Sequence, residues 1–371
     1  MWYTILRTSR RGRLSGSEFD MYDIAIIGLG PAGSILASRL NEKYKVIAID
    51  KKASENEDGF QKPCGGLLAP DAQKALSRFN MTLPTDIMVS PQIFSVRTID
   101  VKSGMTRYYP RHYINLDRHK FDMWLINKIP ERVEVHSNAI CTDIVYGDNE
   151  YQVTYIENGV TTVISARYLV GADGANSIVR RKIFGNFNIK TYLSIQQWFA
   201  DTHDTPFYSC VFDPEITDSY AWGLTKKSHF IFGGAFSTDT GKQDFENLKK
   251  KMLKFGFQLD NPLKTEACLV LRPFGPRNYC YGNKNTFLVG EAAGFISPSS
   301  LEGISHAINS GYLLAKCFNE SEQSPYWQYR RGTRKIRLNL LSKYAKRPFM
   351  YQPLLRKMIM KSGISSIDII E

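Results

Sequence analysis

Hydrophobic and polar positions near the start of the chain change from a strand pattern to a helix pattern. Residues 22–27 form an apolar run that predicts a strand, and residues 34–40 have the spacing of a helix. Between them lies the glycine loop GLGPAG at 28–33. A second strand is predicted at 45–49 and ends at Asp50, about 20 residues after the glycines, which is the spacing of a dinucleotide-binding β-α-β unit.

Each glycine of this first loop has a physical reason. Gly28 makes a tight turn, Gly30 lets the backbone approach a pyrophosphate, and Gly33 lets the helix pack closely on the strand. The N-terminus of the helix then offers free N–H groups to the phosphates. We expect Asp50 to accept hydrogen bonds from the hydroxyls of the adenosine ribose.

Short strands and helices continue through the rest of the chain. After a loop at 62–70 that contains glycine and proline, helices are predicted at 71–79, 117–128 and 245–255, and strands at 94–109, 133–136, 151–156, 163–170 and 286–289. Eleven of the 45 residues at 192–236 are aromatic, twice the 12% of the whole chain. Runs such as 230–236 predict a sheet that forms one wall of a cavity.

Two more glycine turns follow predicted strands. The first is GADG at 171–174, and the second is GEAAG at 290–294, which precedes a helix predicted to begin near Gly303. Each turn alone is compatible with an ordinary connection between a strand and a helix. Together, and in this order after the first loop, they resemble the flavin-binding plan of the aromatic hydroxylase and geranylgeranyl reductase superfamily.

This resemblance implies FAD as the cofactor. In that superfamily the late acid reaches the ribityl chain of FAD, and here the position holds Glu291, one methylene longer. The helix motif R-x-x-F-D is present at 118–122 and implies that Arg118 lies near the FAD phosphates, with a surface helix residue as the alternative. Gly294 replaces the histidine of the aromatic hydroxylases, and SPSSLEGI at 297–304 resembles the reductase branch.

The loop KPCGGLL at 62–68 resembles the C-G-G loop of the reductases, which packs beside the isoalloxazine. Two glycines allow the backbone to contact a flat ring. Cys64 is then either a buried structural thiol or a reactive neighbour of the flavin.

The stretch YAWGL at 220–224 is similar to the reductase pattern Y-x-W-x-F-P, with Leu224 and Thr225 in the last two positions. Tyr220 is a candidate proton donor or positioning group, and Trp222 a candidate cavity wall. The alternative is that both are core aromatics of a sheet.

The candidate site residues fall into two groups. The catalytic candidates are Cys64, Tyr220 and Trp222. The residues expected to bind FAD are Gly28, Gly30, Pro31, Ala32, Gly33, Asp50, Lys51, Cys64, Gly65, Gly66, Arg118, Asp173, Gly174, Gly290, Glu291, Gly303 and Ile304. The six cysteines include no C-x-x-C pair and no Cys/His cluster, so no zinc site, other metal site or disulfide framework is expected.

From residue 21 to about residue 362 the chain resembles the CbrA family of geranylgeranyl-reductase-like flavoproteins, in stretches such as KPCGGLLAPDAQK and GEAAGFISPSSLEGIS. The expected fold is α/β: a Rossmann-type FAD/NAD(P)-binding domain with three layers (β/β/α), an inserted antiparallel-sheet substrate domain and a C-terminal helical segment. The expected boundaries are 21–90, 108–185 and 270–320 for the FAD-binding domain, 91–107 and 186–269 for the substrate domain, 1–20 for an extension outside the fold, and 321–371 for the basic helical segment.

Most of the net charge of +12 lies at the C-terminus, because residues 321–371 contain eleven Lys/Arg and only three Asp/Glu. This segment is either a helical bundle with solvated cations or a surface that lies on an anionic membrane; nucleic acid is not an expected partner. No run reaches the roughly 18 apolar residues of a membrane-spanning helix. The expected location is the cytoplasm, with peripheral attachment at the inner membrane face as an open alternative.

These features predict an FAD-dependent oxidoreductase that reduces an apolar, isoprenoid or lipid-like substrate by flavin hydride transfer. Only one complete dinucleotide fingerprint is present, so the reductant is either transiently bound NAD(P)H or a protein or quinol donor. Two other functions stay open. One is an FAD-dependent monooxygenase, and the other is a non-catalytic protein that binds flavin or lipid at a membrane surface.

Overall fold

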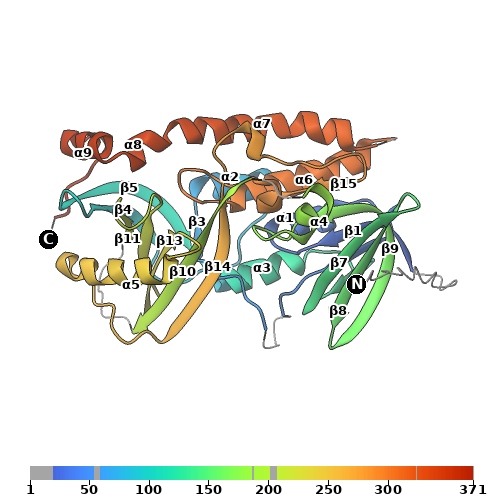
Figure 1. Ribbon diagram of the computed structural model, residues 1–371, viewed down its shortest axis with the longest axis horizontal. Coiled ribbons are helices and arrows are strands. Elements are labelled where there is room, and N and C mark those ends of the chain that lie inside the picture. The colour runs from blue at the N-terminus through green and yellow to red at the C-terminus, as the bar shows by residue number, and fades with distance from the viewer. Residues whose placement is uncertain (1–19, 54–58, 186–187, 201–206, 323, 371) are drawn as a thin grey trace, which may run out of the picture.

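Two β-sheets lie side by side, and the C-terminal helices run along the length of the molecule beside both of them (Figure 1). The computed structural model describes residues 20–53, 59–185, 188–200, 207–322 and 324–370. The predicted extension at 1–20 therefore lies outside the described residues, apart from Asp20.

The first sheet has seven strands. They are β1 (Met21–Ile27), β2 (Val46–Ile49), β6 (Val133–His136), β7 (Ala139–Gly147), β8 (Glu150–Glu157), β9 (Val160–Gly171) and β15 (Thr286–Leu288). The parallel part has the order β6-β2-β1-β9, with β15 beside the end of β9. Strands β7 and β8 form an antiparallel meander with the first half of β9, so β9 passes from one layer into the other, and Ser165 and Ala166 pair with both β1 and β8.

Helices cover the face of the parallel sheet that the meander leaves free. Helices α1 (Pro31–Arg39) and α6 (Ile304–Glu320) bury Leu36, Leu314 and Phe318 against the sheet. At Gly311 a Cβ would lie 2.2 Å from the carbonyl oxygen of Ala32, so only glycine lets α6 approach α1 this closely. Meander, sheet and helices make the three layers of the predicted β/β/α domain, and this part of the fold prediction is confirmed.

The second sheet has eight strands in the order β14-β10-β13-β12-β11-β4-β5-β3. Their bounds are β3 (Leu67–Leu68), β4 (Ile93–Asp100), β5 (Met105–Asn115), β10 (Lys190–Ala200), β11 (Tyr208–Phe212), β12 (Ala221–Lys226), β13 (His229–Phe236) and β14 (Lys264–Arg272). Neighbouring strands are antiparallel, as predicted, except that β4 and β11 are parallel. These two strands come from separate insertions, so no hairpin forces them to run in opposite directions.

The second sheet forms one wall of the cavity, as predicted, but the aromatic residues of 230–236 do not belong to that wall. Phe230, Phe232 and Phe236 face helix α5 (Gly241–Met252), where the rings of Phe232 and Phe245 are stacked 6.0 Å apart, and they do not form the wall of a cavity. Because side chains alternate between the two faces of a strand, the residues that face inward belong to other positions of the same sheet, such as Trp222 and Leu224 on β12.

Several boundaries also differ from the expected ones. The domain limits at 107/108 and 269/270 fall inside β5 and β14, which belong wholly to the second sheet, so that sheet extends to Asn115 and Arg272. Helices α2 (Pro70–Arg78) and α3 (Arg118–Ile126) lie close to their predicted positions. Strands β7 and β14 and helix α4 (Ile178–Phe184) were not predicted.

The C-terminal helices are α7 (Tyr326–Ala345), α8 (Arg347–Tyr351) and α9 (Pro353–Ser362). In Figure 1 they run from the first sheet to the second. Tyr329 is fully buried and its hydroxyl donates to Leu288 O at 2.8 Å, and Leu340 is also fully buried. Helix α7 is therefore an integral part of the fold. Within the described residues, no helix is long and apolar enough to span a bilayer.

Candidate functional site

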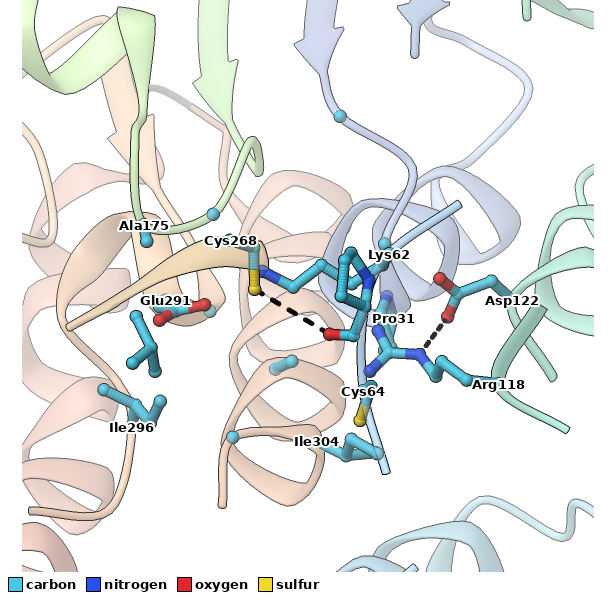
Figure 2. A pocket seen from close by; sticks show the side chains of 18 of the residues that line it. Pro31, Lys62, Cys64, Arg118, Asp122, Ala175, Cys268, Glu291, Ile296 and Ile304 are labelled. Atoms are coloured by element: carbon cyan, nitrogen blue, oxygen red, sulfur yellow. Dashed lines mark hydrogen bonds and ion pairs between the residues drawn. The ribbon is translucent and has the colours of Figure 1, made fainter. Parts of the chain in front are cut away.

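A cavity of about 650 Å³ lies between the two sheets. Its lining combines the three glycine loops, the loop at 62–68 and one face of the eight-stranded sheet. Every residue that the sequence predicted for the site lines this cavity except Gly33. Figure 2 shows Pro31, Cys64, Arg118 and Glu291 around it.

The first glycine loop places the N-terminus of α1 against the cavity. Gly28 has a φ of +100°, and a Cβ there would lie 2.6 Å from Ala172 O. A Cβ on Gly33 would lie 1.9 Å from Gly28 O, so Gly33 packs the helix on the loop. Gly30 precedes the helix and Pro31 begins it, without an acidic residue in the first turn or a side-chain cap. The free N–H groups of this helix end suit an anion.

Asp50 lines the cavity at the end of β2. Its Oδ1 accepts a hydrogen bond from the backbone N of Lys52 at 2.6 Å. Its Oδ2 accepts from Lys52 Nζ at 3.0 Å and from the backbone N of Leu29. The carboxylate is thus held firmly by the protein, and Oδ1 keeps a lone pair for another donor such as a ribose hydroxyl. Lys51 also lines the cavity, with its Nζ 3.9 Å from the ring centre of Phe60.

Asp173, in the second glycine loop, has one oxygen that the protein leaves unpaired. Its Oδ2 accepts from the backbone N of Ile178 at 2.6 Å, at the start of α4. Its Oδ1 is buried and has no hydrogen-bond partner among the described residues. Burial raises the pKa of Asp173. A buried acceptor without a donor is costly, so a ligand hydroxyl at this position would stabilise it.

The third glycine loop is fixed to helix α6 and to strand β14 of the second sheet. The backbone N of Gly290 donates to Ser310 Oγ at 2.9 Å, and Glu291 Oε1 accepts from the backbone N of Leu271 at 2.9 Å. Burial favours the neutral amine of Lys62, but Glu291, Cys268 and Cys64 together outweigh this effect and raise the pKa of Lys62. Glu291 and Lys62 therefore place charges of opposite sign on the cavity lining.

Cys64 and Arg118 lie together on the opposite side (Figure 2). Arg118 Nε donates to Asp122 Oδ1 at 3.0 Å, and Asp122 is buried. Burial disfavours the thiolate of Cys64, but Arg118, the backbone N–H of Gly66 and Lys226 outweigh burial and lower the pKa of Cys64. The thiol is thus placed in a positively charged environment, which is the setting of a reactive cysteine.

Trp222 presents an unsatisfied donor in the same region. Its Nε1 is buried and has no hydrogen-bond partner among the described residues. A Cβ on Gly65 would lie 4.0 Å from this atom and 3.3 Å from Leu224 Cδ2. Gly65 therefore leaves a narrow space between its backbone and the wall formed by β12.

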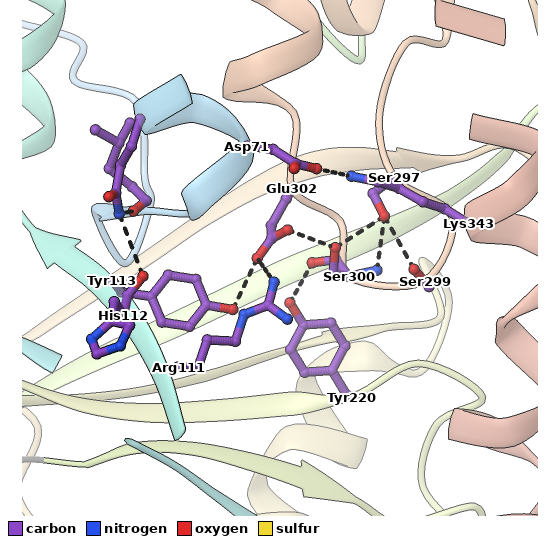
Figure 3. Close-up of polar contacts among 12 residues, drawn as sticks. Asp71, Arg111, His112, Tyr113, Tyr220, Ser297, Ser299, Ser300, Glu302 and Lys343 are labelled. Carbon is purple, nitrogen blue, oxygen red and sulfur yellow. Dashed lines mark hydrogen bonds and ion pairs between the residues drawn. The ribbon is translucent and has the colours of Figure 1, made fainter. Parts of the chain in front are cut away.

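A polar network occupies the end of the cavity near Tyr220 (Figure 3). Tyr220 donates to Ser300 O at 2.6 Å, and the Ser300 hydroxyl donates to Glu302 Oε2 at 3.0 Å. Tyr113 donates to Glu302 Oε1 at 3.0 Å, and Arg111 lies 3.8 Å from the same oxygen. Burial raises the pKa of Tyr220 well above its usual value. Since its proton is committed to a backbone carbonyl, Tyr220 holds the loop at 297–303 in place.

Sequence reasoning missed four polar residues at or beside the cavity. Lys62 and Glu302 flank recognised motifs, so their positions in KPCGGLL and SPSSLEGI were a usable signal. Tyr113 and Lys226 belong to no recognised motif and reach the site only through the second sheet. Lys226 Nζ donates to Leu116 O at 2.6 Å beneath Gly66, and burial lowers the pKa of Lys226 to about 8.

The residues present suit FAD. The free helix end at α1, together with Lys62 and Arg118, offers an anion site for a pyrophosphate. The unpaired Asp173 Oδ1 suits a sugar hydroxyl, and the glycines at 65 and 66 leave room for a flat ring. Within the described residues, no group of three or more His, Cys, Asp or Glu is placed to hold a metal ion. Fold and cavity define an FAD-binding flavoprotein of the oxidoreductase type.

Comparison with known proteins agrees with this class. Residues 142–232 match the family model of an FAD binding domain. Protein CbrA of Escherichia coli O6:H1 is 50% identical over 348 residues, which are 94% of this chain and 95% of that protein. Protein CbrA of Shigella sonnei is 49% identical over 348 residues, which are 94% of this chain and 98% of that protein. The chain belongs to the CbrA family.

Solved structures show the same fold at low sequence identity. A geranylgeranyl bacteriochlorophyll reductase-like protein from Thermoplasma acidophilum has a TM-score of 0.77 and 17% identity, with 93% of this chain and 92% of that chain covered. PqsL from Pseudomonas aeruginosa, a probable FAD-dependent monooxygenase, has a TM-score of 0.67 and 13% identity, with 92% and 100% covered. The fold is thus shared by proteins with different names and does not by itself select a reaction.

Proposed function

We propose that this protein is an FAD-dependent reductase of an apolar, isoprenoid or lipid-like substrate. One observation carries the proposal: a single cavity joins the glycine loops to a wall of aromatic and aliphatic side chains on the second sheet, which includes Tyr208, Trp222 and Leu224. A cofactor held by the loops would therefore face an apolar compartment.

FAD, when bound, supplies the hydride for the reduction. We assign its phosphates to the N-terminus of α1 and to Arg118, and its adenosine ribose to Asp50. Asp173 and Glu291 are assigned to hydroxyls of the ribityl chain. Cys64, Gly65 and Gly66 would lie beside the flat ring, where positive surroundings lower the pKa of Cys64 and favour its thiolate. The remaining residues assigned to FAD line the same loops: Gly28, Gly30, Pro31, Ala32, Lys51, Gly174, Gly290, Gly303 and Ile304.

The second sheet is assigned to the substrate. Trp222 would form the wall next to the reacting carbon atoms and donate its free N–H to a polar atom of the substrate. Saturation of a double bond also requires a proton. We assign the delivery of this proton from solvent to the hydroxyl groups of Tyr113 and Ser300, which donate to the two oxygens of the Glu302 carboxylate beside the half-exposed Arg111. Tyr220 is assigned a positioning role through Ser300.

The test is an anaerobic titration of the full-length protein loaded with FAD. NADPH, NADH, a reduced quinol and dithionite are added separately, and the visible absorbance of the flavin is followed. The reduced protein is then mixed with geranylgeranyl acceptors of different polarity. Reoxidation with formation of a saturated product supports the proposal. If dithionite reduces the flavin but no prenyl or lipid acceptor reoxidises it, the proposal is contradicted. The donor that reduces the flavin shows whether the electrons come from NAD(P)H or from a quinol.

A monooxygenase is the second candidate. The fold resembles that of PqsL, a probable FAD-dependent monooxygenase, with a TM-score of 0.67. Gly294, which stands where the aromatic hydroxylases carry histidine, argues against it. The same reduced protein, mixed with oxygen and substrate, distinguishes the two: a monooxygenase incorporates one atom of labelled oxygen into the product, whereas a reductase incorporates none. A protein that binds flavin or lipid without catalysis would give no product in either experiment.

A further inference from the structure

Helix α9 has its apolar side outward. A helix at the surface of a globular protein normally buries its apolar side and exposes its charges. In α9 the two buried residues are Arg356 and Met360, at 4% and 1% exposure. Leu354 and Met358 are 77% and 66% exposed. The hydrophobic effect does not explain this orientation, because burial of the leucine side would remove more apolar surface from water.

A buried ion pair fixes the orientation. Arg356 Nη2 lies 3.0 Å from Asp100 Oδ1 on β4, and both side chains are almost completely buried. Arg356 Nη1 also donates to Met350 O at 2.7 Å, and its guanidinium lies 4.9 Å from the ring centre of Phe212. Rotation of α9 to bury its leucines would leave Asp100 and Arg356 without partners, which is strongly unfavourable.

The exposed apolar residues on α9 form one stripe. Leu354 and Met358 are four residues apart, as are Leu355 and Ile359, and positions with this spacing are neighbours on a helix surface. We call these four residues the α9 apolar face. Phe349 on α8 and Ile364 after α9 are further exposed apolar residues, at 52% and 70% exposure.

Lysines accompany the α9 apolar face. Lys346, Lys357 and Lys361 are exposed, and none of them forms an ion pair within the part of the chain that the structure describes. The other cations of this region are used internally, since Arg356 pairs with Asp100 and Arg347 with Asp218. The surface is thus both apolar and positively charged.

We propose that the α9 apolar face binds the surface of a bilayer that contains anionic lipids. Apolar side chains would enter the interface, and the three lysines would lie among the headgroups. Helix α9 has only ten residues, so it would lie along the surface. A second copy of the chain fits this face less well, because a symmetric contact would bring the unpaired lysines of both copies together.

Helix α8, which precedes the proposed membrane surface, contacts a loop of the cavity. Tyr351, at the end of α8, donates to Ser299 O at 2.6 Å, and its ring centre lies 4.2 Å from the guanidinium carbon of Arg272. Ser300 and Glu302, next in the same loop, line the cavity. Membrane binding goes beyond the proposed reaction and is independent of it, although it would place an apolar cavity near its source of lipid.

The experiment is co-sedimentation of the full-length FAD-loaded protein with vesicles of phosphatidylcholine alone or with 30% phosphatidylglycerol. We expect binding to the anionic vesicles that falls at least fivefold in 0.5 M NaCl, because salt screens the lysines. The double variant L354S/M358S should lower the partition coefficient at least tenfold, and K357Q/K361Q should lower it only on anionic vesicles. L253S/L263S removes two other exposed leucines, at 56% and 62% exposure, and should leave binding unchanged.

Folding and oligomeric state are measured on the same samples. Flavin absorbance and melting temperature should be equal in all variants, because the replaced side chains are exposed. Wild-type binding no greater to anionic than to neutral vesicles overturns the proposal, as does equal loss of binding in L253S/L263S. Sedimentation velocity provides the last criterion. If the wild type is a dimer and the L354S/M358S variant is a monomer, the α9 apolar face binds a second copy of the chain, and the membrane proposal is overturned. None of these readouts depends on turnover, so failure of the proposed reaction would leave them interpretable.

Discussion

The two walls of the cavity differ in the part of the chain that faces the ligand. The cofactor wall consists mainly of backbone, because Gly28, Gly65 and Gly66 bring main-chain atoms to the surface and the α1 helix end adds N–H groups. The opposite wall, which we propose to hold the substrate and call the substrate wall, consists of side chains on β12 and its neighbours, such as Trp222. A backbone wall cannot adapt to an added atom, whereas a side-chain wall can change its shape. The first should therefore tolerate substitution poorly and the second should alter specificity.

The largest effect is expected from Gly33→Ala, although Gly33 does not touch the cavity. Its new Cβ would lie 1.9 Å from Gly28 O, which is backbone and cannot move aside without displacing the loop. We expect a loss of at least about 3 kcal/mol in the free energy of unfolding, with loss of FAD. Denaturant unfolding and flavin absorbance measure both.

Gly30→Ala is the matched control in the same loop, because no atom lies within 4 Å of the Cβ it would add. This variant should fold like the wild type and bind FAD more weakly, since only the approach of the ligand is obstructed. If Gly33→Ala kept wild-type stability and FAD content, the backbone wall would be as tolerant as the side-chain wall.

Acid should lower the free energy of unfolding, because His306 on α6 is buried in the FAD-binding domain. Burial, with the charge of Lys343, lowers the pKa of His306 from 6.5 to about 4. Between these two pH values the unfolded chain binds more protons than the folded one, so stability present above pH 6.5 is lost as the pH falls. The contribution is on the order of 3 kcal/mol at most.

Urea unfolding of wild type and His306→Gln between pH 7 and pH 4.5 isolates this contribution. The variant should lose less stability on acidification than the wild type, because its amide does not titrate. Parallel pH profiles for the two proteins would mean that His306 is protonated equally well in both states.

Substitution of Trp222 tests the side-chain wall. Trp222→Phe removes a buried N–H that has no partner in the described residues, so stability and FAD content should be unchanged. We expect kcat/KM for reduction of the substrate to fall about ten- to thirtyfold, which corresponds to one lost hydrogen bond. Trp198→Phe is the control, since Trp198 donates to Glu266 Oε2 at 2.8 Å and lies outside the cavity lining; it should lose stability and keep activity. Loss of FAD from Trp222→Phe would assign this residue to the cofactor wall instead.

The smallest effect is expected from Tyr220→Phe. Removal of the hydroxyl leaves Ser300 O without its donor, at a cost of about 1 kcal/mol. A positioning role predicts a fall in kcat/KM of less than tenfold, whereas a proton donor predicts a fall of 100-fold or more. Steady-state kinetics from pH 6 to pH 9 decides between them.

The cofactor side of the site was more predictable from sequence than the substrate side. Glycine loops depend on local backbone geometry, and local geometry leaves a pattern of residues along the chain, as at 28–33 and 171–174. Tyr113 left no such pattern, because it meets Glu302 only after the second sheet has formed from two distant insertions. The aromatic residues of β13 were placed on the wrong side for the same reason. The sequence indicates that one face of the strand is apolar, but not which neighbouring element that face contacts.

The basic C-terminal segment shows what the sequence determines by itself and what depends on the tertiary structure. The sequence alone determined that the segment is helical, positively charged and rich in apolar residues, since these are properties of composition and spacing. Tertiary structure decided which of those residues are exposed. Tyr329 and Leu340 are buried by α7, whereas the buried Arg356–Asp100 pair turns the leucines of α9 toward solvent. An ion pair between residues that are 256 positions apart depends on the packing of two sheets and their helices, and no local pattern encodes it.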